Sequence, residues 1–182
     1  MHFFFNKKGE TNKNLIEQII LEKYNQYYCL AYSYVHNEAD AYDIVQNGAY
    51  KALKGSHALK KPEYAETWVY RIMLNECFRY LKQPKLLSYE SIQDENKGEL
   101  GYIDNAYEKA LDSLSAQDKA VIILRFFEDR KLEEIAEILE ENVSTVKSRL
   151  YRSMKKLYHV LATDINQGIA GLNNGMEDKY GL

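Results

Sequence analysis

Proline, cysteine and tryptophan are scarce in this chain. Its 182 residues include two prolines, two cysteines and one tryptophan. Because proline interrupts helices, so few of them leave long stretches free to be helical. Cys29 and Cys77 are too few and too far apart to form a disulfide framework, which favours free thiols in a reducing compartment.

Long apolar runs and the usual signatures of enzyme sites are missing as well. No window approaches the roughly 18 apolar residues that span a bilayer, and MHFFFNKKGE at the start lacks the apolar stretch of a signal peptide. We therefore expect a cytoplasmic protein with no membrane insertion. The four histidines show no metal-ligand spacing, and there is no glycine-rich phosphate loop or nucleophile motif. We expect neither catalysis nor a cofactor or metal.

Helical periodicity dominates the rest of the chain. Apolar residues recur at helical spacing from Leu15 to Tyr34, over 40–53 and over 65–82, where Pro84 prevents continuation. Residues 86–104 are polar and acidic without sustained period, and helical spacing returns at Asn105, a plausible cap. The pattern predicts an all-α fold with two small helical domains joined by a flexible linker. The expected division is a flexible N-terminus (1–13), a first domain (14–85), a linker (86–104), a second domain (105–162) and a flexible tail (163–182).

Charge changes sign abruptly inside the second domain. Residues 132–141 carry five Glu and no base, whereas residues 142–157 carry five Lys or Arg and no acid, in a chain of net charge −3. A basic island in an acidic protein indicates an anionic partner for that island alone.

The same segment has the layout of a helix-turn-helix. Ser115 and Asp118 resemble a capping box before AVIILRFF. A short helix over 132–139, with Ile135, Ala136 and Leu139 as its buried face, meets a turn of about three residues, and Asn142 can cap the next helix. On that helix the predicted buried face is formed by Val143, Val146, Leu150, Met154 and Leu157.

The opposite face of the second helix is polar and basic, which suits a DNA major groove, with the first residues at base edges and later ones at phosphates. The candidate DNA-binding residues are Asn142, Ser144, Thr145, Lys147, Ser148, Arg149, Arg152, Lys155 and Lys156. The plain alternative is a solvated surface whose charges pair with neighbouring Glu.

Two separate segments resemble one protein family. RKLEEIAEILEENVSTVKSRLYRSMKKL, with LDSLSAQDKAVIILRFFED before it, is similar to the C-terminal helix-turn-helix of the extracytoplasmic-function (ECF) group of bacterial sigma-70 factors. DAYDIVQNGAYKAL resembles the polymerase-binding helix of that group, and ETWVYRIMLNECFRYLK resembles its promoter-melting helix. Asn47, Gly48 and Glu140 depart from the family pattern, which usually has an acidic residue, a bulkier residue and Gly at those places.

The resemblance implies a factor that binds core RNA polymerase and directs it to promoters. The second domain would read the −35 element, and the first would melt and read the −10 element. An anti-sigma protein is a further expected partner. Asp43, Ile44, Val45 and Gln46 would bind polymerase. The −10 and melting residues would be Lys54, His57, Lys60, Lys61, Tyr64, Trp68, Tyr70, Arg71, Asn75 and Arg79.

The chemistry of the first-domain residues agrees with this implication, because melted DNA needs aromatic surfaces for its bases and cations for its backbone. Trp68 can equally be a core residue that supports the site, and Arg71, Asn75 and Asp43 can be ordinary surface groups. Two other classes of function stay open: an autonomous helix-turn-helix regulator acting as a dimer, and a helical module that binds only proteins.

Overall fold

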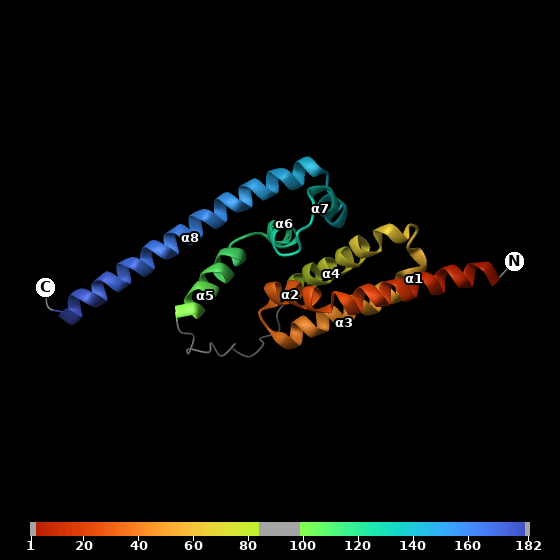
Figure 1. Ribbon diagram of the computed structural model, residues 1–182, viewed down its shortest axis with the longest axis horizontal. Helices are drawn as coiled ribbons and strands as arrows, with labels where there is room; N and C mark the ends of the chain where they lie inside the picture. The colour runs from red at the N-terminus through yellow and green to blue at the C-terminus, as the bar shows by residue number, and fades with distance from the viewer. Residues whose placement is uncertain (1–2, 84–98, 181–182) are drawn as a thin grey trace.

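The computed structural model describes the backbone of residues 3–83 and 99–180, with side chains for 11–83 and 106–163, and all regular structure in these ranges is helical (Figure 1). The first group comprises α1 (Phe3–Glu22), α2 (Tyr24–Val35), α3 (Glu38–Gly55), two short 3-10 turns (Ser56–Ala58 and Pro62–Tyr64) and α4 (Ala65–Lys82). The second comprises α5 (Glu99–Asp112), α6 (Ala116–Phe126), α7 (Leu132–Leu139) and α8 (Val143–Tyr180). The all-α prediction is confirmed.

Several predicted boundaries were wrong. The N-terminus expected to be flexible is helical from Phe3, and the tail from 163 continues α8 to Tyr180. The helix expected at Asn105 begins at Glu99, inside the predicted linker, of which residues 86–98 lie outside the described residues. All three segments contain glycine, which weakens a helix by about 1 kcal/mol but does not end it. No helix in the described part of the chain is long and apolar enough to cross a membrane.

The first group is built on a close packing of α3 against α4. Ile44 and Val45 of α3 and Val69 and Met73 of α4 are at most 2% exposed. At the crossing, a Cβ on Gly48 would lie 2.3 Å from Sδ of Met73. Gly48, where the resembled family usually has a bulkier residue, therefore permits the close approach of the two helices.

The two groups also pack against each other. α7 lies beside α4 (Figure 1). Hydrogen bonds join the start of α6 to the end of α2. The Tyr34 hydroxyl donates to the Ala116 carbonyl (2.8 Å), and Lys119 Nζ, which is 5% exposed, donates to the Ser33 carbonyl (2.7 Å). Buried side chains form one cluster that extends from α1 to α8.

Substitution of Gly48 tests the α3–α4 packing. Gly48→Ala should lower the free energy of unfolding by about 1–3 kcal/mol, because the added methyl forces Met73 to move in a filled core. Gly55→Ala is the matched control, since its Cβ would lie 3.4 Å from the nearest Trp68 atoms, an ordinary contact. Urea denaturation of both variants measures the difference, and equal stability would show that α3 and α4 do not need the glycine.

Candidate nucleic-acid interface

α8 begins at a capped N-terminus, as predicted. Oδ1 of Asn142 accepts hydrogen bonds from the Thr145 amide (2.8 Å), the Thr145 hydroxyl (2.9 Å) and the Ser144 hydroxyl (2.6 Å). The predicted cap before α6 is present too, since Ser115 Oγ accepts from the Asp118 amide. These caps satisfy amides that the helices leave unpaired, and they fix where each helix starts.

The exposed face of α8 contains most of the predicted DNA-binding residues. Ser144, Lys147, Ser148, Arg152 and Lys155 are exposed on it. The packed face is formed by Val146, Leu150 and Ser153. The prediction of Val143 and Met154 there was wrong, because they are 38% and 43% exposed. Ser153 is buried instead, so the packed positions 146, 150, 153 and 157 follow one another at intervals of four, three and four residues. Asn142 and Lys156 are also exposed, and Thr145 is half-buried.

Arg149 points into the structure. It is held by the Glu141 carboxylate at 3.0 Å, by Asp118 Oδ1 at 3.0 Å and by Gln117 Oε1 at 2.8 Å. The hydrogen bond to Glu141 raises the pKa of the guanidinium. Arg149 therefore ties α8 to α6 and to the turn before α8, so its charge is already paired within the protein.

Tyr151 and Tyr158 are exposed residues that the sequence analysis left out. They are 62% and 77% exposed, at positions four and eleven residues after Lys147. The helical spacing places Tyr151 among the exposed cations. Their spacing on the polar face can be read from the sequence, but only amide, aliphatic hydroxyl and basic side chains were taken as candidates on that face.

In the first group, a cavity of about 340 Å³ lies at the start of α4 and collects several predicted −10 residues. Lys60, Lys61, Tyr64, Trp68 and Arg71 are among those that line it. It therefore combines aromatic surfaces with cations, which is the chemistry that unpaired bases and phosphates require.

A residue in the segment expected to be flexible anchors one wall of this cavity. Nδ2 of Asn12, which is 3% exposed, donates to the carbonyls of Ser56 (3.3 Å) and Leu59 (3.0 Å). The sequence around Asn12 carries no sign of this role, because its two partners are more than 40 residues away.

The remaining −10 candidates are divided between surface and interior. Lys54 and His57 are exposed at the end of α3, and Asn75 and Arg79 are exposed on α4. Tyr70 is fully buried: its hydroxyl donates to Glu128 of the second group (2.5 Å).

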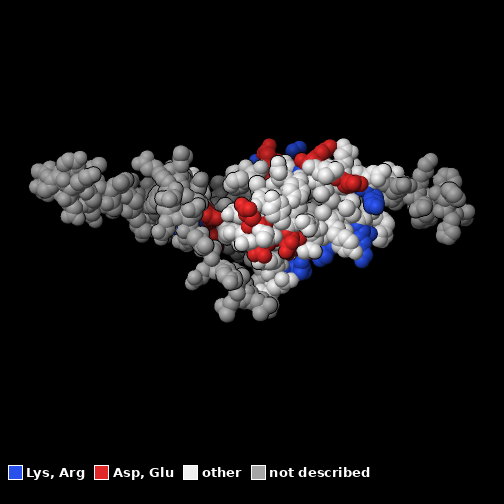
Figure 2. Space-filling model, turned by 90° about the horizontal axis from the view of Figure 1, so that it is seen from below, with Lys and Arg blue, Asp and Glu red and all other residues white. Residues whose placement is uncertain are grey.

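The predicted polymerase-binding set on α3 is also divided. Ile44 and Val45 lie in the core, at 2% and 1% exposure, and so are not available to a partner in this arrangement, whereas Asp43 and Gln46 are exposed. Viewed from below, acidic side chains lie toward the middle of the molecule and basic ones toward the end where α3 finishes (Figure 2). This agrees with Glu38 and Asp40 in the first turn of α3 and Lys54 in its last.

Glu76 of α4 is a buried acid that pairs with two cations, Lys51 of α3 and Arg79 of α4. Lys51 Nζ lies 2.5 Å from Oε1, and Arg79 Nη2 lies 2.8 Å from Oε2. Burial alone would raise the pKa of Glu76, but hydrogen bonds from Lys51 and Arg79 outweigh it and hold the pKa below its usual value. The Lys51–Glu76 pair ties α3 to α4, and Glu76 also holds Arg79 of its own helix.

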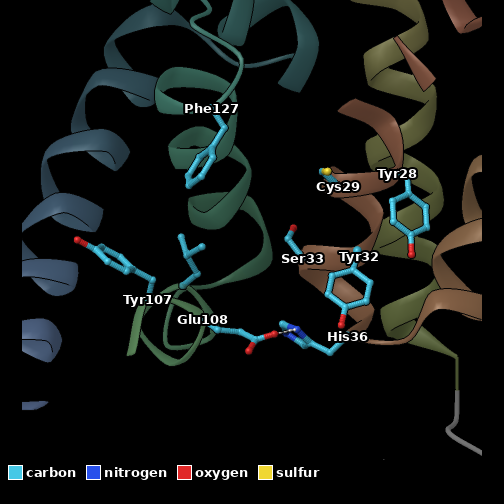
Figure 3. Close-up of a pocket in the computed structure, with 9 residues that line it drawn as sticks. Tyr28, Cys29, Tyr32, Ser33, His36, Tyr107, Glu108 and Phe127 are labelled. Atoms are coloured by element: carbon cyan, nitrogen blue, oxygen red, sulfur yellow. Dashed lines mark ion pairs between the residues drawn. The ribbon is translucent and has the colours of Figure 1, made fainter. Parts of the chain in front are cut away.

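A second cavity, of about 400 Å³, lies where α2 faces α5 and the end of α6. In Figure 3, Tyr107 and Phe127 approach it from one side and Tyr32 and Cys29 from the other, while His36 reaches Glu108. No group of three or more residues suited to a metal occurs in the described part of the chain.

The pairing of Glu76 predicts a pH-dependent stability. Its depressed pKa contributes stability that is present above the pKa of the unfolded carboxyl, about 4.3, and is lost as pH falls through the folded value. Glu76→Gln should therefore lower unfolding free energy by about 1–3 kcal/mol at pH 7 and by much less at pH 3. Chemical denaturation across this range checks it. Glu133→Gln, an exposed acid, serves as control, and a pH-independent loss would contradict the role of the carboxylate charge.

Comparison with known families matches both groups of helices. The family described as sigma-70 region 2 matches residues 20–85, and that described as sigma-70, region 4 matches residues 104–157. The two matches cover the first group from the end of α1 and the second group through the first half of α8.

Individual relatives are similar over most of their length. The RNA polymerase sigma factor SigV of Bacillus subtilis is 44% identical over 153 residues, covering 82% of this chain and 92% of that protein. The ECF RNA polymerase sigma-E factor of Escherichia coli is 26% identical, over 81% of this chain and 92% of its own.

Solved structures share the fold. The sigma factor RpoE bound to the anti-sigma factor NepR from Bartonella quintana superposes with a TM-score of 0.62 at 22% identity, covering 81% of this chain and 97% of that one. CnrH in complex with the cytosolic domain of CnrY gives 0.67 at 21% identity, covering 89% and 97%.

Proposed function

Because this chain belongs to the ECF group of the sigma-70 family, we propose a division of promoter recognition between its two helical groups. The protein is a transcription initiation factor that binds core RNA polymerase and directs it to promoters. The observation that carries the division of labour is the exposed, capped and basic face of α8, together with a separate aromatic and cationic cavity at the start of α4.

We assign recognition of the −35 element to α8. Asn142, Ser144 and Thr145 lie at its N-terminus, where the partial positive charge of the helix favours phosphate. Lys147, Ser148, Arg152 and Lys155 continue the exposed face, and Tyr151 extends it. Arg149 supports this surface from behind through Glu141 and Asp118, and Lys156 is held near the Ser113 carbonyl.

We assign the −10 element and melting to the first group. Lys60, Lys61, Tyr64 and Trp68 would take an unpaired base in their cavity, with Arg71, Asn75 and Arg79 farther along α4. Lys54 and His57 would contact the backbone beside it. Tyr70 acts from the interior by holding α4 in place, since its side chain is fully buried.

Polymerase contact is assigned to the exposed side of α3, with Asp43 and Gln46 as its predicted residues. Ile44 and Val45 shape that surface only through the core. The chemistry of transcription belongs to the polymerase, so we infer no catalysis by this chain. Its site of action is then the cytoplasm, where promoter DNA and polymerase are found.

An anti-sigma protein is a further proposed partner. The two structural neighbours are each bound to such a protein or to its cytosolic domain. The exposed aromatic side chains Phe127 and Tyr107 line the cavity between α2 and α5, and they offer a surface that a protein can cover.

Substitutions on α8 separate DNA contact from structural support. Lys147→Ala and Arg152→Ala should each reduce −35-dependent run-off transcription severalfold with an unchanged melting temperature, since each removes an exposed cation. Arg149→Ala should reduce both transcription and melting temperature, because it leaves Asp118 and Glu141 without their cation. In-vitro transcription at two salt concentrations, with thermal melting, distinguishes them. Retained activity in all three variants would contradict the assignment.

Asn75→Ala tests the role of α4 in promoter opening. The variant should bind core polymerase like wild type but form fewer open complexes, measured by permanganate reactivity of promoter thymines. A template with a pre-melted bubble is the control, because it should restore activity when only opening is impaired. An equal defect on both templates would assign Asn75 to another step.

A further inference from the structure

The acidic end of α7 lies against the part of α4 assigned above to melted DNA. Glu137 lines the same cavity as Lys60, Lys61 and Trp68. Arg71, at the edge of this cavity, donates from Nη1 to Oε1 of Glu140 at 2.7 Å and from Nη2 to the Glu137 carbonyl. One cavity thus joins residues of both helical groups.

The oxygens that reach Arg71 are of the kind that a DNA backbone would offer. A guanidinium fork pairs with two oxygens of a carboxylate or a phosphate through parallel, charge-assisted hydrogen bonds. Here one oxygen comes from a carboxylate and one from a helix C-terminal carbonyl, which carries partial negative charge. The C-terminal end of α7 therefore presents negative charge where nucleic acid would.

Glu140 occupies its position at a conformational cost. Its φ is 56°, in the left-handed region, where a residue other than Gly costs of order 1 kcal/mol. Glycine would satisfy the turn without that cost, but it would not supply a carboxylate to Arg71. The turn itself gives no reason for Glu, whereas the contact with α4 does.

Neighbouring contacts hold α7 over α4 in this register. Arg130, just before α7, pairs with Glu66 of α4 and lies over the Tyr70 ring, 4.8 Å from its centroid. Glu66 also pairs with Lys23 at 2.9 Å. Glu128 accepts the Tyr70 hydroxyl. The position of Glu137 and Glu140 is thus defined by several interactions across the two groups.

We propose that the acidic end of α7 is an internal substitute for nucleic acid, which holds Arg71 at the edge of the −10 cavity in the free protein and must release it when core polymerase is bound. This inference rests on the proposed function of the cavity. The Arg71–Glu140 pair is solvent-accessible, with side-chain exposures of 32% and 67%, so it is weak enough for a partner to displace. The contact competes with DNA for Arg71 in the free protein, and a partner can still break it.

The test compares two doubly substituted full-length chains without polymerase. Glu137→Gln/Glu140→Gln removes the two charges at the cavity, and Glu17→Gln/Glu133→Gln removes two exposed charges elsewhere. Fluorescence anisotropy measures binding of a short, labelled, mixed-sequence single-stranded DNA. The cavity variant should bind roughly two- to tenfold more tightly than the control variant, since it loses the Arg71–Glu140 ion pair and the negative charge of Glu137 at the cavity, while the Glu137 carbonyl stays in place. Equal affinities would overturn the proposal.

Two further measurements keep its failure separate from failure of the proposed function. With core polymerase, the cavity variant should initiate transcription as well as wild type, because α7 has already moved; a loss of initiation in the variant alone would make Glu137 and Glu140 part of the working site and overturn the proposal. If wild type itself directed no initiation, the proposed function would fail instead. Glu140→Gly, which relieves the left-handed backbone, should also bind single-stranded DNA more tightly while melting at a higher temperature, and unchanged binding would count against the proposal.

Discussion

Tyr70 is enclosed by both helical groups, and its packing controls how α4 can be used. The ring meets Tyr27 edge to face, with centroids 4.9 Å apart, while Arg130 covers it and Glu128 accepts its hydroxyl. Burial is the largest cause of the raised pKa of Tyr70, so the hydroxyl stays protonated and continues to donate. A helix expected to touch DNA along its length is therefore packed on two sides, and only its outer residues remain for other partners.

The abrupt change of charge along residues 132–157 has two structural consequences. Downstream, Lys147, Arg152, Lys155 and Lys156 are exposed, and among the described residues none of them pairs with an acid, whereas Arg149 does. Upstream, the acids are used inside the protein: Glu134 accepts from the Lys131 amide, Glu141 holds Arg149 and Glu140 holds Arg71. The alternative interpretation, that neighbouring Glu neutralise the basic helix, is thus correct for Arg149. Because the acids and the cations are separated in sequence, the exposed face of α8 is basic, while the acidic α7 lies against α4 of the first group.

Local rules predicted the elements well where the signal is local. Asn142 and Ser115 cap their helices as expected, because a cap needs only a side-chain oxygen and an amide three residues on. The bounds of α4 and α7 were predicted correctly because Pro84 and the turn before Asn142 end the helical pattern. The same rules did not find the helical backbone that precedes Asn105 or that continues toward both ends of the chain. They also could not find Asn12, whose partners are distant in sequence, or the cost that a Cβ at Gly48 would impose on Met73.

The amino-acid sequence by itself determined the helical class, the two-part organisation, the basic helix and the family, since periodicity, caps and motif order are properties of short segments. Only the tertiary structure decided which side chains those segments expose. Ile44, Val45 and Tyr70 share helices with exposed residues, yet packing buries them. Arg149 and Arg71 are side chains of the kind that contact DNA, yet in the folded protein they form ion pairs with Glu141 and Glu140. The exposure of these side chains depends on which helices pack together, and no single segment of the sequence specifies contacts between distant segments.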